Sequence, residues 1–260
     1  MTEDGPRSIF RTPAFIATAL SFGLFGFITG IWEVLLADLR TSLSLSPGAL
    51  GVVLTVGVLA AIPAMLVGGR IVDRFSPRVL IGIAGFVMGV AILGISQARS
   101  YWFLAGTFLL YFAANSAFDV GINAAGIDVE QANGQRIMTY FHAAYSAFAA
   151  ISALLAGILL TADVSFRLIY IGLAIAVALI AILFFVTRSL PERHRTRNET
   201  EAAGDQRSLF LNFAIVLIAG IVFLSYFAEG TIENWSAIYL RSWLTLPAII
   251  GASGVALFHA

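Results

Sequence analysis

The stretch "GGRIVDRFSPRVL" (residues 68–80) places a group of charges between two long apolar runs of the chain. Asp73 lies among three arginines, so these side chains can form a compact ionic cluster. The arginines are Arg70, Arg74 and Arg78. Charged groups avoid the lipid interior because their transfer there costs several kcal/mol. The stretch therefore predicts a charged turn at the surface-exposed end of a membrane helix.

The two glycines that open this stretch, Gly68 and Gly69, would allow a neighbouring helix to approach closely. The apolar runs on either side cover residues 48–70 and 79–98. Each is long enough to span a bilayer, because a spanning helix needs about 20 mostly apolar residues. The sequence therefore predicts two membrane helices joined by a short charged loop.

The composition of the whole chain points to the same environment. Hydrophobic residues make up 59% and charged residues 12% of the 260 residues, and the mean hydropathy is +0.92. Soluble domains are about 45–50% apolar and about 25% charged. The net charge is zero, which gives no electrostatic reason to expect nucleic-acid binding, and the absence of cysteine excludes disulfides and thiol chemistry.

Apolar runs of spanning length recur along the chain, and an eighth begins near residue 246 and stops with the chain. We therefore expect an all-α membrane protein with a six-helix bundle at residues 1–188, a polar inter-half loop at 189–208, and the start of a truncated second bundle at 209–260. This layout matches transporters built as two six-helix halves. The predicted spans are 13–38, 48–70, 79–98, 101–126, 137–161, 165–187 and 209–230.

The arginines predict the orientation of these helices. All fifteen basic residues are arginine, and eleven of them fall on the side that carries the N-terminus and residues 189–208. Cytoplasmic loops of membrane proteins carry an excess of basic residues. We therefore expect a multi-pass protein of the plasma (inner) membrane, with a cytoplasmic N-terminus and residues 162–165 outside.

The charged stretch resembles the hallmark loop between helices 2 and 3 of the major facilitator superfamily. Ser76 replaces the second glycine of that pattern and Pro77 replaces a basic residue. The resemblance implies that the loop helps to lock the cytoplasmic side of a transporter, whereas the alternative is a simple positive-inside anchor with one incidental acid. The matching positions are Gly69, Asp73, Arg74 and Arg78.

Two further segments resemble an uncharacterised bacterial branch of this superfamily, related distantly to the fucose permease group. This resemblance implies a family rather than a solute, because the solutes of that branch are poorly defined. The matching residues are Asp119, Asn123, Glu130, Arg136, Met138, Phe141 and His142 in the first segment, and Glu229, Gly230, Trp235, Ser236, Tyr239 and Leu240 in the second.

Polar residues inside the apolar run 101–126 are candidates for a solute or proton pathway. Asn115, Asp119 and Asn123 fall within about 80° of one another at about 100° per residue. Such a stripe must face protein or water, because lipid would not solvate it. Asp119 is therefore either a pore or coupling residue or a buried acid bonded to a neighbouring helix.

Candidates also occur in three other predicted helices. Glu33 ends a strip of three glycines and is interpreted either as a site residue or as a rim residue near the outer end of its helix. Glu229 shares a face with Glu233 near the outer end of its own helix, which fits an external gate or solute contact. His142 and Ser146 face the same way, as packing residues or a proton relay.

The first functional hypothesis is a secondary transporter of a small polar solute, driven by protons, with a sugar as one class that amides and tryptophan would suit. The alternatives are a non-transporting fragment of such a transporter and, more remotely, an intramembrane enzyme. The zinc-protease and hydrolase motifs are absent, so we predict no enzymatic activity, cofactor or metal. The expected partners are the bilayer, a solute and protons, with the intact form a monomer.

Overall fold

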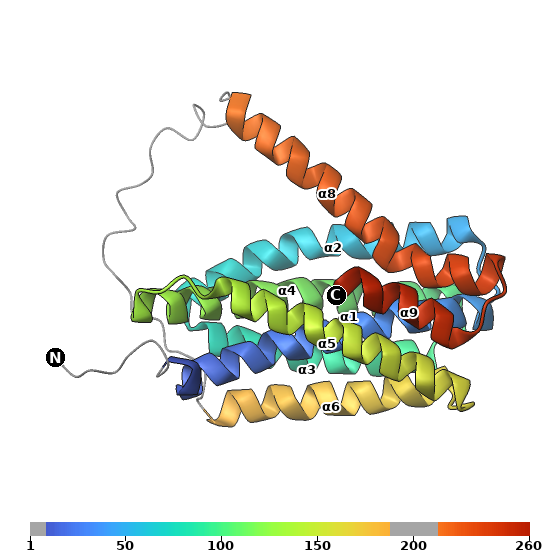
Figure 1. Cartoon of the computed structure of the whole chain (residues 1–260), viewed down its shortest axis with the longest axis horizontal. Coiled ribbons are helices and arrows are strands. Elements are labelled where there is room, and N and C mark those ends of the chain that lie inside the picture. The colour runs from blue at the N-terminus through green and yellow to red at the C-terminus, as the bar shows by residue number, and fades with distance from the viewer. Residues whose placement is uncertain (1–8, 188–212) are drawn as a thin grey trace.

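The computed structural model describes residues 9–187 and 213–260, and this part of the chain is built from helices joined by short turns (Figure 1). Seven of its helices are long and apolar enough to cross a membrane, which confirms the predicted all-α membrane fold. The helices are η1 (Ile9–Arg11), α1 (Pro13–Ser42), α2 (Pro47–Arg74), α3 (Pro77–Gln97), α4 (Tyr101–Asn133), α5 (Met138–Thr161), α6 (Phe166–Thr187), α8 (Phe213–Ile238), the π-helix η3 (Tyr239–Trp243) and α9 (Ala248–His259).

Side-chain caps explain where four of the helices begin. The hydroxyl of Ser76 accepts a hydrogen bond from the backbone N–H of Val79 at 3.4 Å, and Pro77 occupies the first position of α3. Serine at the N-cap and proline in the first turn both favour a helix start. The two departures from the family pattern in the charged loop therefore act together to begin α3. The other capped starts are Thr12 for α1, Ser46 for α2 and Ser100 for α4.

The helices pack in pairs around one apolar core. The most extensive contacts join α1 to α5, α3 to α6 and α2 to α4, and α3 also packs on α4. Large side chains at these contacts, such as Phe108, Phe118 and Tyr170, are fully buried. Leucines on the outer faces, such as Leu66 and Leu179, are exposed. This inside-to-outside distribution suits a bundle whose surroundings are lipid.

Glycines let α1 and α5 approach closely. A Cβ atom on Gly26 would collide with the backbone oxygen of Tyr145, and one on Gly30 would collide with that of Ala149. The predicted close packing at Gly68 also occurs, since a Cβ there would meet the Cα of Ala117 on α4 at 3.7 Å. For Gly69 the prediction is wrong, because a Cβ on it would have no neighbour within 4 Å in the described part.

The last two helices, α8 and α9, lie against α1 and α5. α9 packs mainly on α5, and α8 contacts both α1 and α9. Figure 1 shows α8 (orange) leaning away from the other helices toward its N-terminal end, where its side chains are exposed. Its C-terminal part reaches the bundle, where Ala237 and Ile238 are buried.

Four predicted spans end too early, since α2 continues to Arg74 rather than residue 70 and α4 continues to Asn133 rather than residue 126. α8 continues to Ile238 rather than ending near residue 230, and α1 continues to Ser42 rather than to residue 38. The expectation that Glu229 and Glu33 lie near the outer ends of their helices is therefore wrong. The predicted loop at 189–208 lies outside the described residues.

Candidate functional site

A cavity of about 340 Å³ opens between α1, α4, α5 and α8. Five of the six predicted pathway residues line it, although they come from four different helices. They are Glu33, Asn115, Asp119, His142 and Glu229. The structure therefore brings together residues that lie almost 200 positions apart in the sequence.

The sixth candidate, Asn123, does not line the cavity but holds a residue that does. Its side-chain nitrogen donates hydrogen bonds to the Oδ1 atom of Asp119 at 2.8 Å and to the backbone oxygen of Asp119 at 3.0 Å. This pair lies one turn apart on α4, so the amide fixes the rotamer of the acid. Asn123 is thus a positioning residue for Asp119.

Aromatic rings form much of the cavity wall. Trp32 and Tyr111 stack with ring centroids 4.6 Å apart, and Tyr145 packs against Phe25 at 5.6 Å. These rings come from α1, α4 and α5, and all four residues line the cavity. The sequence analysis did not select Tyr111 or Tyr145, because aromatic residues are common throughout apolar helices and carry no signal of their own.

His142 lies at the cavity on the α5 side. Its ring meets the Phe22 ring edge-on, with centroids 5.2 Å apart. Ser146, one turn further along α5, is not among the residues that line the cavity. The two residues therefore do not form the shared pathway face that their spacing suggested.

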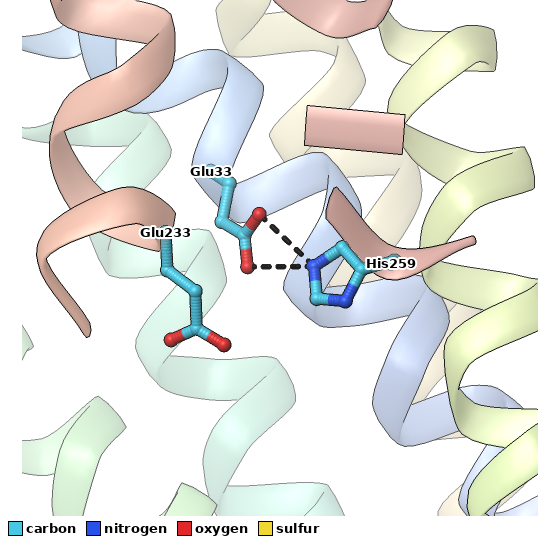
Figure 2. A group of neighbouring side chains, drawn as sticks. All are labelled: Glu33, Glu233 and His259. Carbon is cyan, nitrogen blue, oxygen red and sulfur yellow. Dashed lines mark hydrogen bonds and ion pairs between the residues drawn. The ribbon is translucent and has the colours of Figure 1, made fainter. Parts of the chain in front are cut away.

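Glu33 lies in the interior and not at the rim. Only 1% of the residue is exposed, and the Nε2 atom of His259 lies 3.1 Å from each of its carboxylate oxygens. Figure 2 shows this contact and, beside it, the side chain of Glu233, which has a carboxylate oxygen within 4.8 Å of the ligand atoms of the other two residues. The rim interpretation of Glu33 is wrong, because α9 covers it. The sequence analysis missed His259, which has no polar neighbours along the chain.

The cavity is acidic. Four carboxylates line it, and the lining residues include no lysine or arginine. They are Glu33, Asp119, Glu229 and Glu233. Uncompensated carboxylates in a low-dielectric surrounding are unfavourable unless a proton or another cation neutralises them. The arrangement is therefore suited to binding protons or cations along with a neutral polar group.

A comparison with protein families identifies the fold. The model of the Major Facilitator Superfamily matches residues 14–259. The chain belongs to this superfamily. Among curated relatives, an uncharacterized MFS-type transporter of Yersinia pestis is 24% identical over 245 residues, which is 94% of this chain and 62% of that protein.

Two rhizobial proteins are similar to the same extent. The uncharacterized transporter y4wD of Sinorhizobium fredii is 28% identical over 225 residues, covering 86% of this chain and 58% of that protein. The membrane protein MosC of Rhizobium meliloti is 25% identical over 248 residues, covering 93% and 58%. This major facilitator chain thus spans about three fifths of the length of the curated relatives it matches.

A solved structure confirms the fold of this major facilitator chain. It is the crystal structure of a bacterial homolog of the human lysosomal transporter Spinster, in an inward-facing and unoccupied conformation. The TM-score is 0.68 at 14% identity, and the match covers 100% of this chain and 60% of the other. At this identity the likeness speaks for the fold alone.

The hallmark loop of this major facilitator chain lies apart from the cavity. Asp73 and Arg74 are exposed at the end of α2, and Arg78 is half-buried in the first turn of α3. The guanidinium of Arg74 lies 5.6 Å from the centroid of the Phe75 ring. None of these residues lines the cavity. The loop therefore has no direct part in holding whatever the cavity binds.

An ion pair links α1 to η3 beyond the cavity. Arg241 donates to both carboxylate oxygens of Asp38, with one N···O distance of 2.8 Å, and also reaches the backbone oxygen of Val34 at 3.5 Å. Sequence reasoning missed this pair, because its two members lie on opposite sides of the long polar segment.

Proposed function

We propose that the protein is a secondary active transporter of a small polar solute, coupled to protons and working by alternating access. The cavity carries this proposal, since its wall combines α1, α4 and α5 with α8, which follows the inter-half segment. Transporters of this architecture bind solute between their two halves, near the middle of the bilayer.

The lining chemistry supports a polar and sugar-like solute. Asn115 and the carboxylates offer hydrogen-bond donors and acceptors, while the stacked rings of Trp32 and Tyr111 offer a flat apolar face. Ligand sites commonly combine apolar and aromatic walls with a few convergent polar groups. A sugar ring, with hydroxyls at its edge and an apolar face, matches both parts of this wall.

Proton coupling is supported by acids in the membrane interior. Intramembrane carboxylates are rare and frequently serve as proton relays in transporters. Asp119 lines the cavity and is held through its Oδ1 atom by Asn123, so its position is fixed while its second carboxylate oxygen remains available to the solute space. We assign Asp119 as the first coupling residue and Glu33 as the second.

Alternating access needs contacts that close one side at a time. The Asp38–Arg241 pair links elements on either side of the inter-half segment, and the orientation proposed from the arginines places it outside. The hallmark loop with Gly69, Asp73, Arg74 and Arg78 would then lie on the cytoplasmic side and act in closing it. We further propose residues 1–188 as the first bundle, 189–208 as the cytoplasmic inter-half loop, and 209–260 as the start of the second bundle.

The cellular setting belongs to the same proposal. We place the protein in the plasma (inner) membrane as a monomer, within a branch distantly related to the fucose permease group. We propose solute transport as the activity of the protein. The alternative is that this chain is a non-transporting fragment of such a transporter.

Reconstitution tests the proposal. The purified protein is placed in proteoliposomes loaded with a pH-sensitive dye, and a panel of monosaccharides and polyols is added outside. We expect a saturable, solute-dependent acidification of the lumen that a protonophore abolishes. Solute binding is measured separately by the fluorescence of Trp32, which lines the cavity. The other tryptophans are first replaced by phenylalanine. Binding without any solute or proton movement would favour the non-transporting alternative.

A further inference from the structure

Three side chains from three helices converge beside the cavity. Glu33 comes from α1, Glu233 from α8 and His259 from α9, and one ligand atom of each lies within 4.8 Å of the others (Figure 2). Glu33 and His259 are buried, with 1% and 8% of each residue exposed. Two carboxylates and one imidazole are a mixed oxygen and nitrogen set, which suits first-row divalent metals better than an oxygen-only set does.

The distances fit metal coordination. Around a tetrahedral Zn²⁺ with ligand bonds of about 2.0–2.1 Å, neighbouring ligand atoms lie about 3.3 Å apart. The Nε2 atom of His259 already lies 3.1 Å from both carboxylate oxygens of Glu33. The remaining ligand, Glu233, therefore needs to move by at most about 1.5 Å, which rotation of its flexible side chain supplies.

The cluster holds two carboxylates whose charge a proton or a metal cation must balance. Glu33 has His259 as its partner, whereas Glu233 has no hydrogen bond or ion pair with any residue in 9–187 or 213–260. The lining of the adjoining cavity contributes carboxylates but no lysine or arginine. Two ionised carboxylates and a neutral imidazole carry a charge of minus two, so one divalent cation makes the cluster neutral. Burial of charge is tolerated when the charge is paired or coordinates a metal.

We propose that Glu33, Glu233 and His259 bind one divalent transition-metal ion of the Zn²⁺ type. Three protein ligands leave a tetrahedral ion with one open position, as in zinc sites that bind water or substrate. Glu33 and Glu233 line the cavity, so the open position faces it. A hydroxyl or carboxylate oxygen of a solute can occupy that position. The metal thereby adds a Lewis-acidic contact to the solute site.

Calorimetry with Zn²⁺ tests this site. The purified protein is freed of any polyhistidine tag, treated with a chelator and titrated in detergent; the absence of cysteine removes competing thiol ligands. We expect one saturable site that weakens at least about 100-fold in His259→Gln and in Glu233→Gln. Tyr226→Phe is the matched control, because it removes a polar group of the cavity lining that lies outside the cluster and changes no charge. Its metal affinity should change less than about fivefold.

A spectroscopic readout keeps the test decisive if a variant fails to fold. Co²⁺ bound to the wild-type protein should show the intense visible bands of tetrahedral coordination, and Zn²⁺ should displace it. Binding should be tighter at about pH 7.5 than at about pH 5.5, because protons compete for the ligands. No saturable binding by the wild type, a Co²⁺ spectrum without these bands, or equal affinity in His259→Gln would overturn the proposal.

A bound metal ion and a proton would compete for Glu33, because metal ligands must be deprotonated, but the two proposals have separate readouts. Zn²⁺ binding at the cluster without solute movement would contradict only the transporter assignment. Solute-driven proton movement by a protein that binds no Zn²⁺ would contradict only the metal site.

Discussion

At the scale of single residues, Asp119 and Asn123 show how one turn of helix can prepare an acid for function. The amide of Asn123 donates to Asp119 Oδ1 at 2.8 Å, which leaves the second carboxylate oxygen available to the cavity. The sequence left open either a pore residue or an acid bonded to a neighbouring helix, but the bond that the structure shows lies within α4. Asp119 is bonded within its own helix and also faces the solute space.

The substitution Asp119→Asn keeps the shape of the side chain and removes its ability to carry a proton. We expect the variant to lose uphill, proton-driven accumulation of solute while it retains solute exchange and downhill flux. Counterflow and gradient-driven uptake, measured at matched expression, separate these activities. Accumulation at the wild-type level would rule out the coupling role of Asp119 and make Glu33 the next candidate.

Glu130 lies further along α4 and has a different task. Its Oε2 atom accepts hydrogen bonds from the backbone N–H groups of Ile137 and Met138, at 2.8 and 3.0 Å, where α5 begins. An acid at a helix N-terminus satisfies free N–H groups and interacts favourably with the helix dipole. Glu130 is therefore a capping residue for the start of α5.

Removal of this cap should cost stability and leave transport chemistry intact. We expect Glu130→Ala to lower the free energy of unfolding by about 1–2 kcal/mol. Thermal unfolding in detergent measures the effect. Gln131→Ala is the control, since the exposed side chain of Gln131 makes no hydrogen bond in the described part of the chain. Equal melting of the two variants would show that the cap contributes nothing.

At the scale of helices, the contact of α1 with α5 positions Glu33. Gly26 and Gly30 of α1 allow the two backbones to lie close together. Glu33 follows Gly30 by three residues, so it lies on the same face of α1. In membranes the hydrophobic effect does not drive helices together. Helices associate instead through close packing, which small residues at the contact allow. A larger residue in this contact should therefore disturb both stability and the site.

We expect Gly26→Ala to destabilise the protein by about 1–3 kcal/mol, because the added methyl group meets the rigid backbone of Tyr145. Gly106→Ala is the matched control, since a Cβ on Gly106 of α4 meets no atom of the described residues within 4 Å. Alanine there should be neutral or stabilise by up to about 1 kcal/mol. Melting temperatures in the same detergent compare the two. Similar values for both variants would show that close approach is not needed.

The contact of α1 with η3 belongs to the same scale. Asp38→Asn removes the charge that holds Arg241, so we expect the conformational balance to shift toward outward opening. Because the chain has no native cysteine, a single Ser116→Cys in the cavity reports accessibility to an impermeant thiol reagent added outside cells. Labelling should rise in the Asp38→Asn background. Arg40→Gln is the control, since the Nε atom of Arg40 donates to the Leu45 oxygen in the turn after α1 and to no residue of another described helix.

At the scale of the whole molecule, the bilayer made the fold predictable. Backbone groups in lipid must be satisfied within the segment, so an apolar run of sufficient length is a helix. The periodicity of α4 placed Asn115 and Asp119 on an inner face for the same local reason. Partners far apart in sequence gave no such signal: His259 lies 226 residues from Glu33, and Arg241 lies 203 residues from Asp38. Only tertiary packing brings these pairs together.

Orientation in the membrane is the property of the whole chain that the fold leaves open, and the arginine distribution predicts it. With the N-terminus inside, the loop between α4 and α5 is cytoplasmic and the loop between α5 and α6 is external. Gln135 and Asp163 are exposed residues in these two loops, so a cysteine at either is available to reagent. We expect an impermeant thiol reagent to label Asp163→Cys in intact cells and Gln135→Cys only after the membrane is opened. The reverse pattern would invert the topology, and with it the assignment of the Asp38–Arg241 pair to the outer side and of the hallmark loop to the inner one.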